Sequence, residues 1–220
     1  MRDAPRIDDL FPPEVRIASS APVDCEDELF PEERALVARA AASRRREFAT
    51  ARVCARRLLA QLGAPERPLL RAEDRSPLWP SGFTGSISHC HDLCVVAVAR
   101  CESLCALGVD VEPAGALEPE LWTSLCTPRE LAWIHDQQVA VRGRQVRLLF
   151  SAKESAYKTV ARAAGADLGF HDFEVDLELD AGRFTATWRS GGPQARGGSC
   201  NGAFAFRSRW VFTASSIVSG

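Results

Sequence analysis

The segment Gly108-Val109-Asp110-Val111-Glu112 constrains this chain more than any other feature of its sequence. Side chains alternate along a β-strand, so Asp110 and Glu112 project from one face while the two valines project from the other. Two neighbouring carboxylates on an apolar strand are costly unless a cation neutralises them. The segment therefore predicts either a metal-binding strand or an edge strand with one solvated face, and the spacing alone leaves both open.

A second segment, Phe150-Ser151-Ala152-Lys153-Glu154-Ser155-Ala156-Tyr157-Lys158, is predicted to lie in a helix over residues 143–164. Glu154 and Lys158 are one turn apart on one helix face. Mg²⁺ binds a few carboxylates and completes its octahedron with water and substrate phosphates, so the two segments together could hold a metal-bound phosphate ester. The alternatives for Glu154 are a capping box with Ser151 and a surface ion pair with Lys158.

Positive charge is concentrated locally, although the 220 residues carry a net charge of only −2. Arginine suits a phosphate monoester, but a basic helix face is usually just solvated. The motif Gly85-Ser86-Ile87-Ser88-His89 offers backbone amides, hydroxyls and an imidazole to a phosphate, although a histidine beside a turn is more often structural. Six arginines crowd one predicted helix just after an acidic segment: Arg44, Arg45, Arg46, Arg52, Arg56 and Arg57.

The order of predicted elements is helix, strands, helices and strands, which indicates an α+β fold of two halves meeting near residues 100–107. No repeat is visible in the sequence itself. Pro31 and the Thr127 capping box mark helix starts, and period-two alternation marks the strands. The predicted elements are a helix over 31–63, a short hairpin over 69–79, strands over 85–89 and 93–99, a helix over 128–138, the helix over 143–164, a loop over 191–202, and strands over 203–206 and 210–218.

Composition excludes several classes of protein. The net charge gives no argument for nucleic-acid binding, and no apolar run is long enough to cross a bilayer. No secretory signal precedes the eight cysteines, which predicts reduced thiols in a cytoplasmic protein. The cluster His89-Cys90-His91-Asp92-Leu93-Cys94 suggests zinc but lacks a matched second pair of ligands at a zinc-site spacing. We expect neither nucleic-acid nor membrane partners.

The order of the motifs resembles that of a 4′-phosphopantetheinyl transferase of the Sfp type, in the branch that includes enterobactin synthetase component D. The resemblance spans residues 44–170 and is carried chiefly by the two acidic motifs described above. Further motifs that match are Arg46-Glu47-Phe48 with Arg52 and Cys54-Ala55, Pro77-Leu78-Trp79-Pro80, Gly85-Ser86-Ile87-Ser88-His89 and Leu168-Gly169-Phe170.

The resemblance implies a pseudo-twofold duplication of two similar α+β halves, with coenzyme A bound in the cleft between them. Residues 1–103 would form the N-terminal half that binds the coenzyme A phosphates. Residues 104–220 would carry the Mg²⁺ site and dock the protein substrate, an apo acyl or peptidyl carrier protein of polyketide, nonribosomal-peptide or siderophore synthesis. A monomer is implied, because the two halves supply the cleft internally.

The resemblance also assigns roles to individual residues. Asp110, Glu112 and Glu154 match the Mg²⁺ ligands, and Glu154 also matches the residue proposed to deprotonate the acceptor serine. Lys158 matches the lysine that stabilises the leaving 3′,5′-ADP, and Lys153 is a motif position assigned to coenzyme A with a less settled role. The positions that match the 3′-phosphate site are Arg44, Arg52, Arg71, Ser88 and His89.

Two positions depart from the family pattern. Asp167 stands where many relatives carry tryptophan, which predicts a different contact with the pantetheine arm, and Arg71 stands where close relatives carry lysine. Two other functions stay open at this point. One is a non-catalytic module that binds coenzyme A or carrier proteins, and the other is a Mg²⁺-dependent phosphohydrolase acting on nucleotides.

Overall fold

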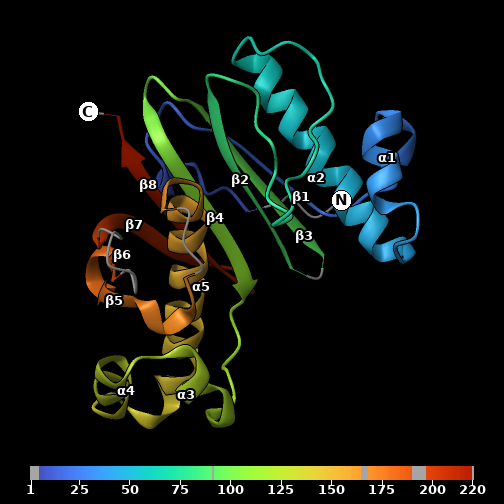
Figure 1. Cartoon of the computed structure of the whole chain (residues 1–220). Coiled ribbons are helices and arrows are strands. Elements are labelled where there is room, and N and C mark those ends of the chain that lie inside the picture. The colour runs from blue at the N-terminus through green and yellow to red at the C-terminus, as the bar shows by residue number, and fades with distance from the viewer. Residues whose placement is uncertain (1–4, 91, 165–167, 190–196, 220) are drawn as a thin grey trace.

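The first half of the chain forms a small antiparallel sheet covered by a long helix. The computed structural model describes residues 5–90, 92–164, 168–189 and 197–219 (Figure 1). Strands β1 (Arg16–Ser20), β2 (Phe83–Cys90) and β3 (Leu93–Arg100) pair in the order β1-β3-β2. Every residue of β3 except Arg100 is buried, as expected of a central strand. Helix α1 (Pro31–Val37) precedes helix α2 (Ala42–Gln61), which packs on one face of this sheet.

The second half forms a larger antiparallel sheet with its own long helix. The five strands pair in the order β4-β8-β7-β6-β5, and helix α5 (Val139–Ala164) packs against them. The other elements are β4 (Leu104–Pro113), α3 (Trp122–Leu125), α4 (Pro128–His135), β5 (Phe173–Glu178), β6 (Arg183–Trp188), β7 (Gly198–Arg207) and β8 (Trp210–Val218). Short 3-10 helices lie at Asp8–Leu10, Glu26–Glu28, Pro119–Leu121, Phe170–Asp172 and Leu179–Ala181.

The strand order of the first sheet recurs in the second. In the first half, β1 precedes the helices and pairs with β3, whose hairpin partner is β2. In the second half, β4 precedes the helices and pairs with β8, whose hairpin partner is β7. Strands β6 and β5 extend only the second sheet. This repeated order of elements is what a duplication of one α+β unit predicts.

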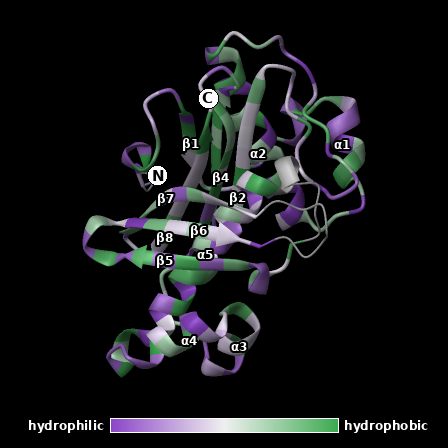
Figure 2. Cartoon of the chain, turned by 60° about the vertical axis from the view of Figure 1, so that its left-hand side comes forward, coloured by the Kyte–Doolittle hydropathy of each residue, from purple (hydrophilic) through white to green (hydrophobic). Residues whose placement is uncertain are grey.

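The two halves meet where β2 runs beside β4. Serine hydroxyls replace backbone carbonyls at this junction, because Ser86 Oγ accepts the amide proton of Val109 at 3.1 Å and Ser88 Oγ accepts that of Val111 at 3.3 Å. Both valines are fully buried in an apolar cluster that also contains β3 and β8 residues. Hydrophobic colour accordingly follows the central strands, while hydrophilic stretches lie on the peripheral helices α1 and α4 (Figure 2). The junction therefore leaves the carboxylate face of β4 turned toward α5.

Most predicted elements are confirmed, and four need correction. The hairpin expected over 69–79 forms no strands, only an isolated β-bridge between Arg71 and Pro77, and the helix expected from residue 143 begins at Val139. The single helix expected over 31–63 is two helices, because the chain turns after Val37 and restarts at Ala42. The loop expected over 191–202 is wrong for residues 198–202, which belong to β7 and pair with β6. Within the described part of the chain, no helix is both long and apolar enough to span a membrane.

Candidate active site

Asp110 is the buried centre of the site. Its side chain projects from β4, and the residue is only 3% exposed. Oδ1 accepts hydrogen bonds from Lys158 Nζ at 2.7 Å and from Ser88 Oγ at 2.8 Å, and Oδ2 accepts one from Ser151 Oγ at 2.8 Å. A buried carboxylate stays ionised only when it is paired and hydrogen-bonded in this way. The alternative of a solvated strand face is therefore wrong for Asp110.

Glu112 and Glu154 complete a set of three carboxylates. Glu112 accepts a hydrogen bond from Arg147 Nη1 at 2.8 Å, and Glu154 Oε2 lies 3.9 Å from Lys158 Nζ. Burial raises the pKa of both glutamates, and the negative charge of Asp110 raises each further. For Glu154 the nearby Lys158 partly offsets this rise in pKa. Ser151 lies inside α5, so it does not cap the helix at Glu154.

One cavity of about 330 Å³ brings these groups together. Asp110, Glu112 and Glu154 all line it, which confirms that the two acids of β4 share one face. Within the described ranges, no three His, Cys, Asp or Glu side chains already stand close enough to hold a metal ion. Lys158 and Arg147 instead supply the positive charge beside Asp110 and Glu112. The other lining residues are Ile87, Ser88, His89, Phe150 and Lys158.

The chemistry of these donors suits Mg²⁺. The ion prefers carboxylate oxygens and retains open positions for water and phosphate. Three carboxylates line one cavity, so these are the residues that could hold a divalent cation. The zinc cluster considered from the sequence includes His91, which lies outside the described residues.

A second charged cluster lies at the same cavity, where α2 approaches the end of β2. Arg44 Nη1 contacts His89 Nε2, and Glu47 Oε2 lies 3.2 Å from Arg44 Nη1 and 3.5 Å from His89 Nδ1. Burial and the adjacent Arg44 lower the pKa of His89, with a smaller opposing effect from Glu47. The structure therefore brings together Arg44, Ser88 and His89, as the resemblance implied. Glu47 belongs to the matched motif Arg46-Glu47-Phe48, but the sequence assigned it no role.

Arg52 is buried and anchored to the backbone. It is 5% exposed, its Nε donates to the carbonyl of Leu69 at 2.7 Å, and its guanidinium lies 4.4 Å from the centre of the Phe48 ring. Burial lowers the pKa of Arg52 to about 10, and the positive charges of Arg44 and Arg71 contribute to that shift. Arg71 is exposed, and its backbone forms an isolated antiparallel β-bridge with Pro77. These arginines therefore form a positively charged region beside the His89 cluster.

Most of the other arginines on α2 are already paired with the acidic segment upstream. Arg45 bonds Glu26 at 3.0 Å, Arg57 bonds Glu28 at 2.8 Å, and Arg56 bonds the buried Glu33. The sequence placed the acids and arginines in neighbouring segments but did not reveal these pairs. These pairs engage Arg45, Arg56 and Arg57, whereas Arg44 contacts His89 at the cavity.

Lys153 does not face the carboxylate cavity. It is fully buried on another side of α5, where Nζ lies 2.7 Å from Glu130 Oε2 and donates to the carbonyls of Leu125 and Phe170 at 2.9 Å each. All three ammonium hydrogens thus have protein partners. This placement does not support the expectation that Lys153 binds coenzyme A through its charge.

Lys153→Ala should therefore act on stability. We expect the free energy of unfolding to fall by about 3–5 kcal/mol, because the change leaves the Glu130 carboxylate buried without a cation. Urea denaturation of the variant and of the double variant Lys153→Met with Glu130→Gln measures this. The double variant should be the more stable of the two, and a loss below about 1 kcal/mol for Lys153→Ala, typical of an exposed pair, would contradict the assignment.

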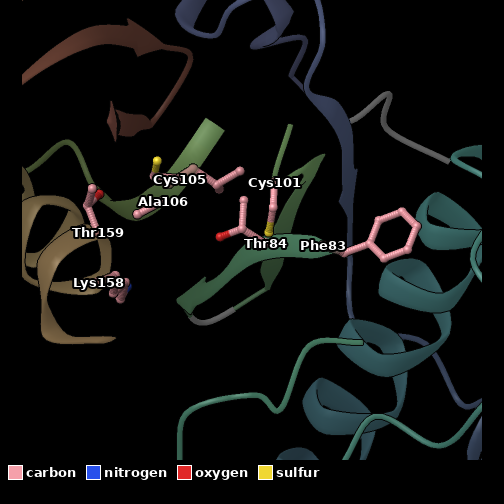
Figure 3. Close-up of a pocket in the computed structure, with 9 residues that line it drawn as sticks. Phe83, Thr84, Cys101, Cys105, Ala106, Lys158 and Thr159 are labelled. Carbon is pink, nitrogen blue, oxygen red and sulfur yellow. The ribbon is translucent and has the colours of Figure 1, made fainter. Parts of the chain in front are cut away.

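Two further cavities extend the site along α5. An apolar pocket of about 150 Å³ shares Glu154 with the carboxylate cavity. Asp167, which the sequence marked as a departure from the family pattern, lies outside the described residues. Another cavity, of about 220 Å³, shares Lys158 and lies farther along β2 and β4 (Figure 3). There Lys158 and Thr159 of α5 face Thr84 and Cys101. The apolar pocket is lined by Lys153, Glu154, Tyr157, Leu168, Gly169, Phe170 and Phe173.

Comparisons with known proteins identify the class to which this site belongs. Residues 32–99 match the family model of the 4′-phosphopantetheinyl transferase N-terminal domain, and residues 106–205 match that of the 4′-phosphopantetheinyl transferase superfamily. The chain belongs to the 4′-phosphopantetheinyl transferase superfamily, whose members transfer phosphopantetheine from coenzyme A to carrier proteins.

Individual relatives agree with this assignment. The chain is 42% identical to the 4′-phosphopantetheinyl transferase Svp of Streptomyces mobaraensis, over 88% of this chain and 78% of Svp. It is 36% identical to the 4′-phosphopantetheinyl transferase PptT of Mycobacterium tuberculosis, over 73% of this chain and 70% of PptT. Enterobactin synthase component D of Escherichia coli is 33% identical over 60% of this chain and 61% of its own length.

Proposed function

We propose that this chain moves the 4′-phosphopantetheine arm of coenzyme A onto a serine hydroxyl of an apo acyl or peptidyl carrier protein. The serine oxygen forms a bond to the β-phosphorus, the bond from that phosphorus to the leaving 3′,5′-ADP breaks, and the serine proton passes to the protein. Family membership supports the proposal. The observation that carries it is the cavity in which Asp110, Glu112, Glu154 and Lys158 face one another.

We further propose that Asp110, Glu112 and Glu154 hold Mg²⁺. When bound, the ion would neutralise the pyrophosphate oxygens of coenzyme A. Lys158 pairs with Asp110 and Arg147 pairs with Glu112, so these two cations would share the carboxylates with the ion. Two cations of α5 thus serve as counter-ions for the two acids of β4.

Glu154 and Lys158 are proposed to handle the proton and the leaving group. Burial raises the pKa of Glu154, which makes its carboxylate a better acceptor for the serine proton. Lys158 lies 2.7 Å from Asp110 and would stabilise negative charge on the departing phosphate. Asp110 fixes that lysine and thereby takes part in both metal binding and catalysis.

The remaining groups are proposed to position coenzyme A. Arg44, Arg52, Arg71, Ser88 and His89 would bind the 3′-phosphate and adjoining groups. Ser88 and His89 line the cavity, Arg44 contacts His89, and Arg44 and Arg71 lie close enough to Arg52 to influence its charge. The apolar pocket beside Glu154 has the character required by the pantetheine arm. Coenzyme A would then lie across the junction of the two halves, with its reacting phosphorus near Glu154 and Lys158.

The domain division follows the same proposal. Residues 1–103 would bind the phosphates, and residues 104–220 would hold Mg²⁺ and dock the carrier protein. Because the repeated topology places both units in one chain, we propose that the protein acts as a monomer in the cytoplasm. Carrier proteins of polyketide, nonribosomal-peptide or siderophore synthesis are the proposed partners.

One assay separates this function from its rivals. The protein is mixed with an apo carrier protein, coenzyme A and Mg²⁺, and the carrier protein is weighed by mass spectrometry. A gain equal to one phosphopantetheine group supports the transferase. Coenzyme A binding without a mass gain supports the non-catalytic module, and breakdown of coenzyme A without a mass gain supports the phosphohydrolase.

The phosphate site has its own test. Arg52→Ala or His89→Ala should raise the KM for coenzyme A about tenfold or more and leave the KM for dephospho-coenzyme A nearly unchanged, because a lost charge-assisted hydrogen bond is worth about 1.5–3 kcal/mol. Steady-state kinetics with both substrates measures the difference. Equal losses with the two substrates would place these residues outside the 3′-phosphate site.

A further inference from the structure

In the described part of the chain, each half contains a buried glutamate in the same local setting. In the first half, Glu33 is the third residue of α1, after Pro31 at the first position. Its Oε2 accepts the amide proton of Phe30 at 3.0 Å, and its Oε1 accepts that of Leu69 at 2.8 Å. One carboxylate thus caps a short helix and fixes a distant backbone segment.

Glu130 makes the corresponding contacts in the second half. It is the third residue of α4, after Pro128 at the first position, and it is 3% exposed. Its Oε2 accepts the amide proton of Thr127 at 2.7 Å, and its Oε1 accepts that of Val175 at 2.8 Å. In both glutamates, Oε2 accepts the amide proton of the N-cap residue and Oε1 accepts that of a residue distant in the chain.

The cations that pair with these glutamates are equivalent too. Arg56 of α2 bonds Glu33 Oε2 and follows it by 23 residues in the chain. Lys153 of α5 lies 2.7 Å from Glu130 Oε2 and follows it by the same 23 residues. Both cations lie on the long helix of their half, in units with the same strand order. Neither pair is accounted for by the proposed chemistry.

We propose that the Glu33–Arg56 and Glu130–Lys153 pairs are one duplicated device that positions the two ends of the coenzyme A site. This inference rests on the proposed function. Glu33 holds the amide of Leu69, whose carbonyl accepts the Nε–H of Arg52 at 2.7 Å, and Arg71 follows two residues later. Arg56 lies one turn after Arg52 on α2. Glu33 is therefore the positioning residue for the phosphate-binding arginines.

The second pair acts at the other end of the site. Lys153 precedes Glu154 on α5 and donates to the carbonyl of Phe170, and both Glu154 and Phe170 line the apolar pocket. Glu130 also fixes the amide of Val175 in β5. The Glu130–Lys153 pair therefore sets the distance between α5, which carries the reacting carboxylate, and the segment that closes the pocket around the pantetheine arm.

The inference predicts different kinetic consequences for the two pairs. Glu33→Gln should weaken binding of coenzyme A about tenfold and binding of dephospho-coenzyme A less than about twofold, because only the 3′-phosphate ligands lose their support. Glu130→Gln should weaken both ligands alike and lower kcat. A purely structural role for either pair would lower the fraction of folded protein but leave the affinities of the folded protein for both ligands, and its kcat, unchanged.

Calorimetric titration of both ligands into the folded protein provides the test, because it does not depend on catalysis. Arg56→Lys is titrated beside Glu33→Gln, since it keeps the charge and remains informative if Glu33→Gln fails to fold. The matched control is Arg57→Gln. Arg57 lies next to Arg56 on α2 and forms an exposed pair with Glu28, so its loss should leave both affinities unchanged.

The outcomes distinguish the inference from the proposed function. If the unaltered protein binds coenzyme A no better than dephospho-coenzyme A, the proposed 3′-phosphate site fails. If the unaltered protein prefers coenzyme A and folded Arg56→Lys retains that preference in full, the positioning role of the Glu33–Arg56 pair is wrong. A reduced preference in Arg56→Lys and Glu33→Gln, with Arg57→Gln unaffected, supports it.

Discussion

Asp110→Asn should reduce transfer by about a thousandfold or more, because removal of one preorganised electrostatic group from an active site typically costs 10²–10³ in rate and this carboxylate serves two groups. It is assigned to Mg²⁺, and it anchors Lys158 at 2.7 Å. Asparagine keeps the size of the side chain and an oxygen that can accept from Ser88 or Ser151, so the fold should be retained. Single-turnover transfer at saturating Mg²⁺ measures the loss.

The matched control for Asp110→Asn is Asp176→Asn on β5, a change at a carboxylate that is 57% exposed and paired with Arg129. It should leave transfer unchanged, because exposed ion pairs contribute little. Near-normal turnover of Asp110→Asn would contradict both the metal assignment and the proposed role of Lys158. Circular dichroism and urea denaturation of the two variants show whether a loss of activity reflects loss of fold.

Glu154→Gln should separate binding from chemistry. Glutamine keeps the size and one coordinating oxygen of glutamate, but it cannot usefully accept a proton. Coenzyme A with Mg²⁺ should therefore bind nearly as in the unaltered protein, while transfer falls by about 10²–10⁴, the usual contribution of a general base. Calorimetry beside a single-turnover assay measures the two effects independently.

The alternative for Glu154 makes the opposite prediction. Glu154 and Lys158 are separated by 3.9 Å, and Lys158 lies closer to Asp110. If Glu154 served only as an ion-pair partner of Lys158, loss of that pair would cost under about 1 kcal/mol. The rate would then be nearly unchanged. Transfer by Glu154→Gln within about threefold of the unaltered rate would return Glu154 to a role in an ion pair on the helix.

The sequence predicted the local elements of the site because local periodicity determines them. Alternation placed Asp110 and Glu112 on one face of β4 with Val109 and Val111 opposite, and the structure confirms this. Helical spacing likewise placed Glu154 and Lys158 on one face of α5. The motifs of the resemblance then identified the family, which the comparisons confirm.

The position of Lys153 could not be predicted from the motif that contains it. Lys153 and Lys158 belong to one motif, yet Lys158 reaches Asp110 while Lys153 is buried against Glu130. A helix turns by about 100° per residue, so five residues place two side chains on different faces. Which face meets the carboxylates and which meets α4 depends on packing, and no pattern within the motif contains that information.

The sequence by itself determined which residues alternate, which share a helix turn and which family the motifs match. Only the tertiary structure decided how the charges combine. Arg147 and Lys158 of α5 neutralise the acids of β4, and Ser88 of β2 donates a hydrogen bond to Asp110. Glu33 and Glu130 pair with cations that lie 23 residues away in the chain. Such pairs form because burial makes an isolated charge costly, and burial is set by how the two sheets and their helices pack rather than by any local pattern.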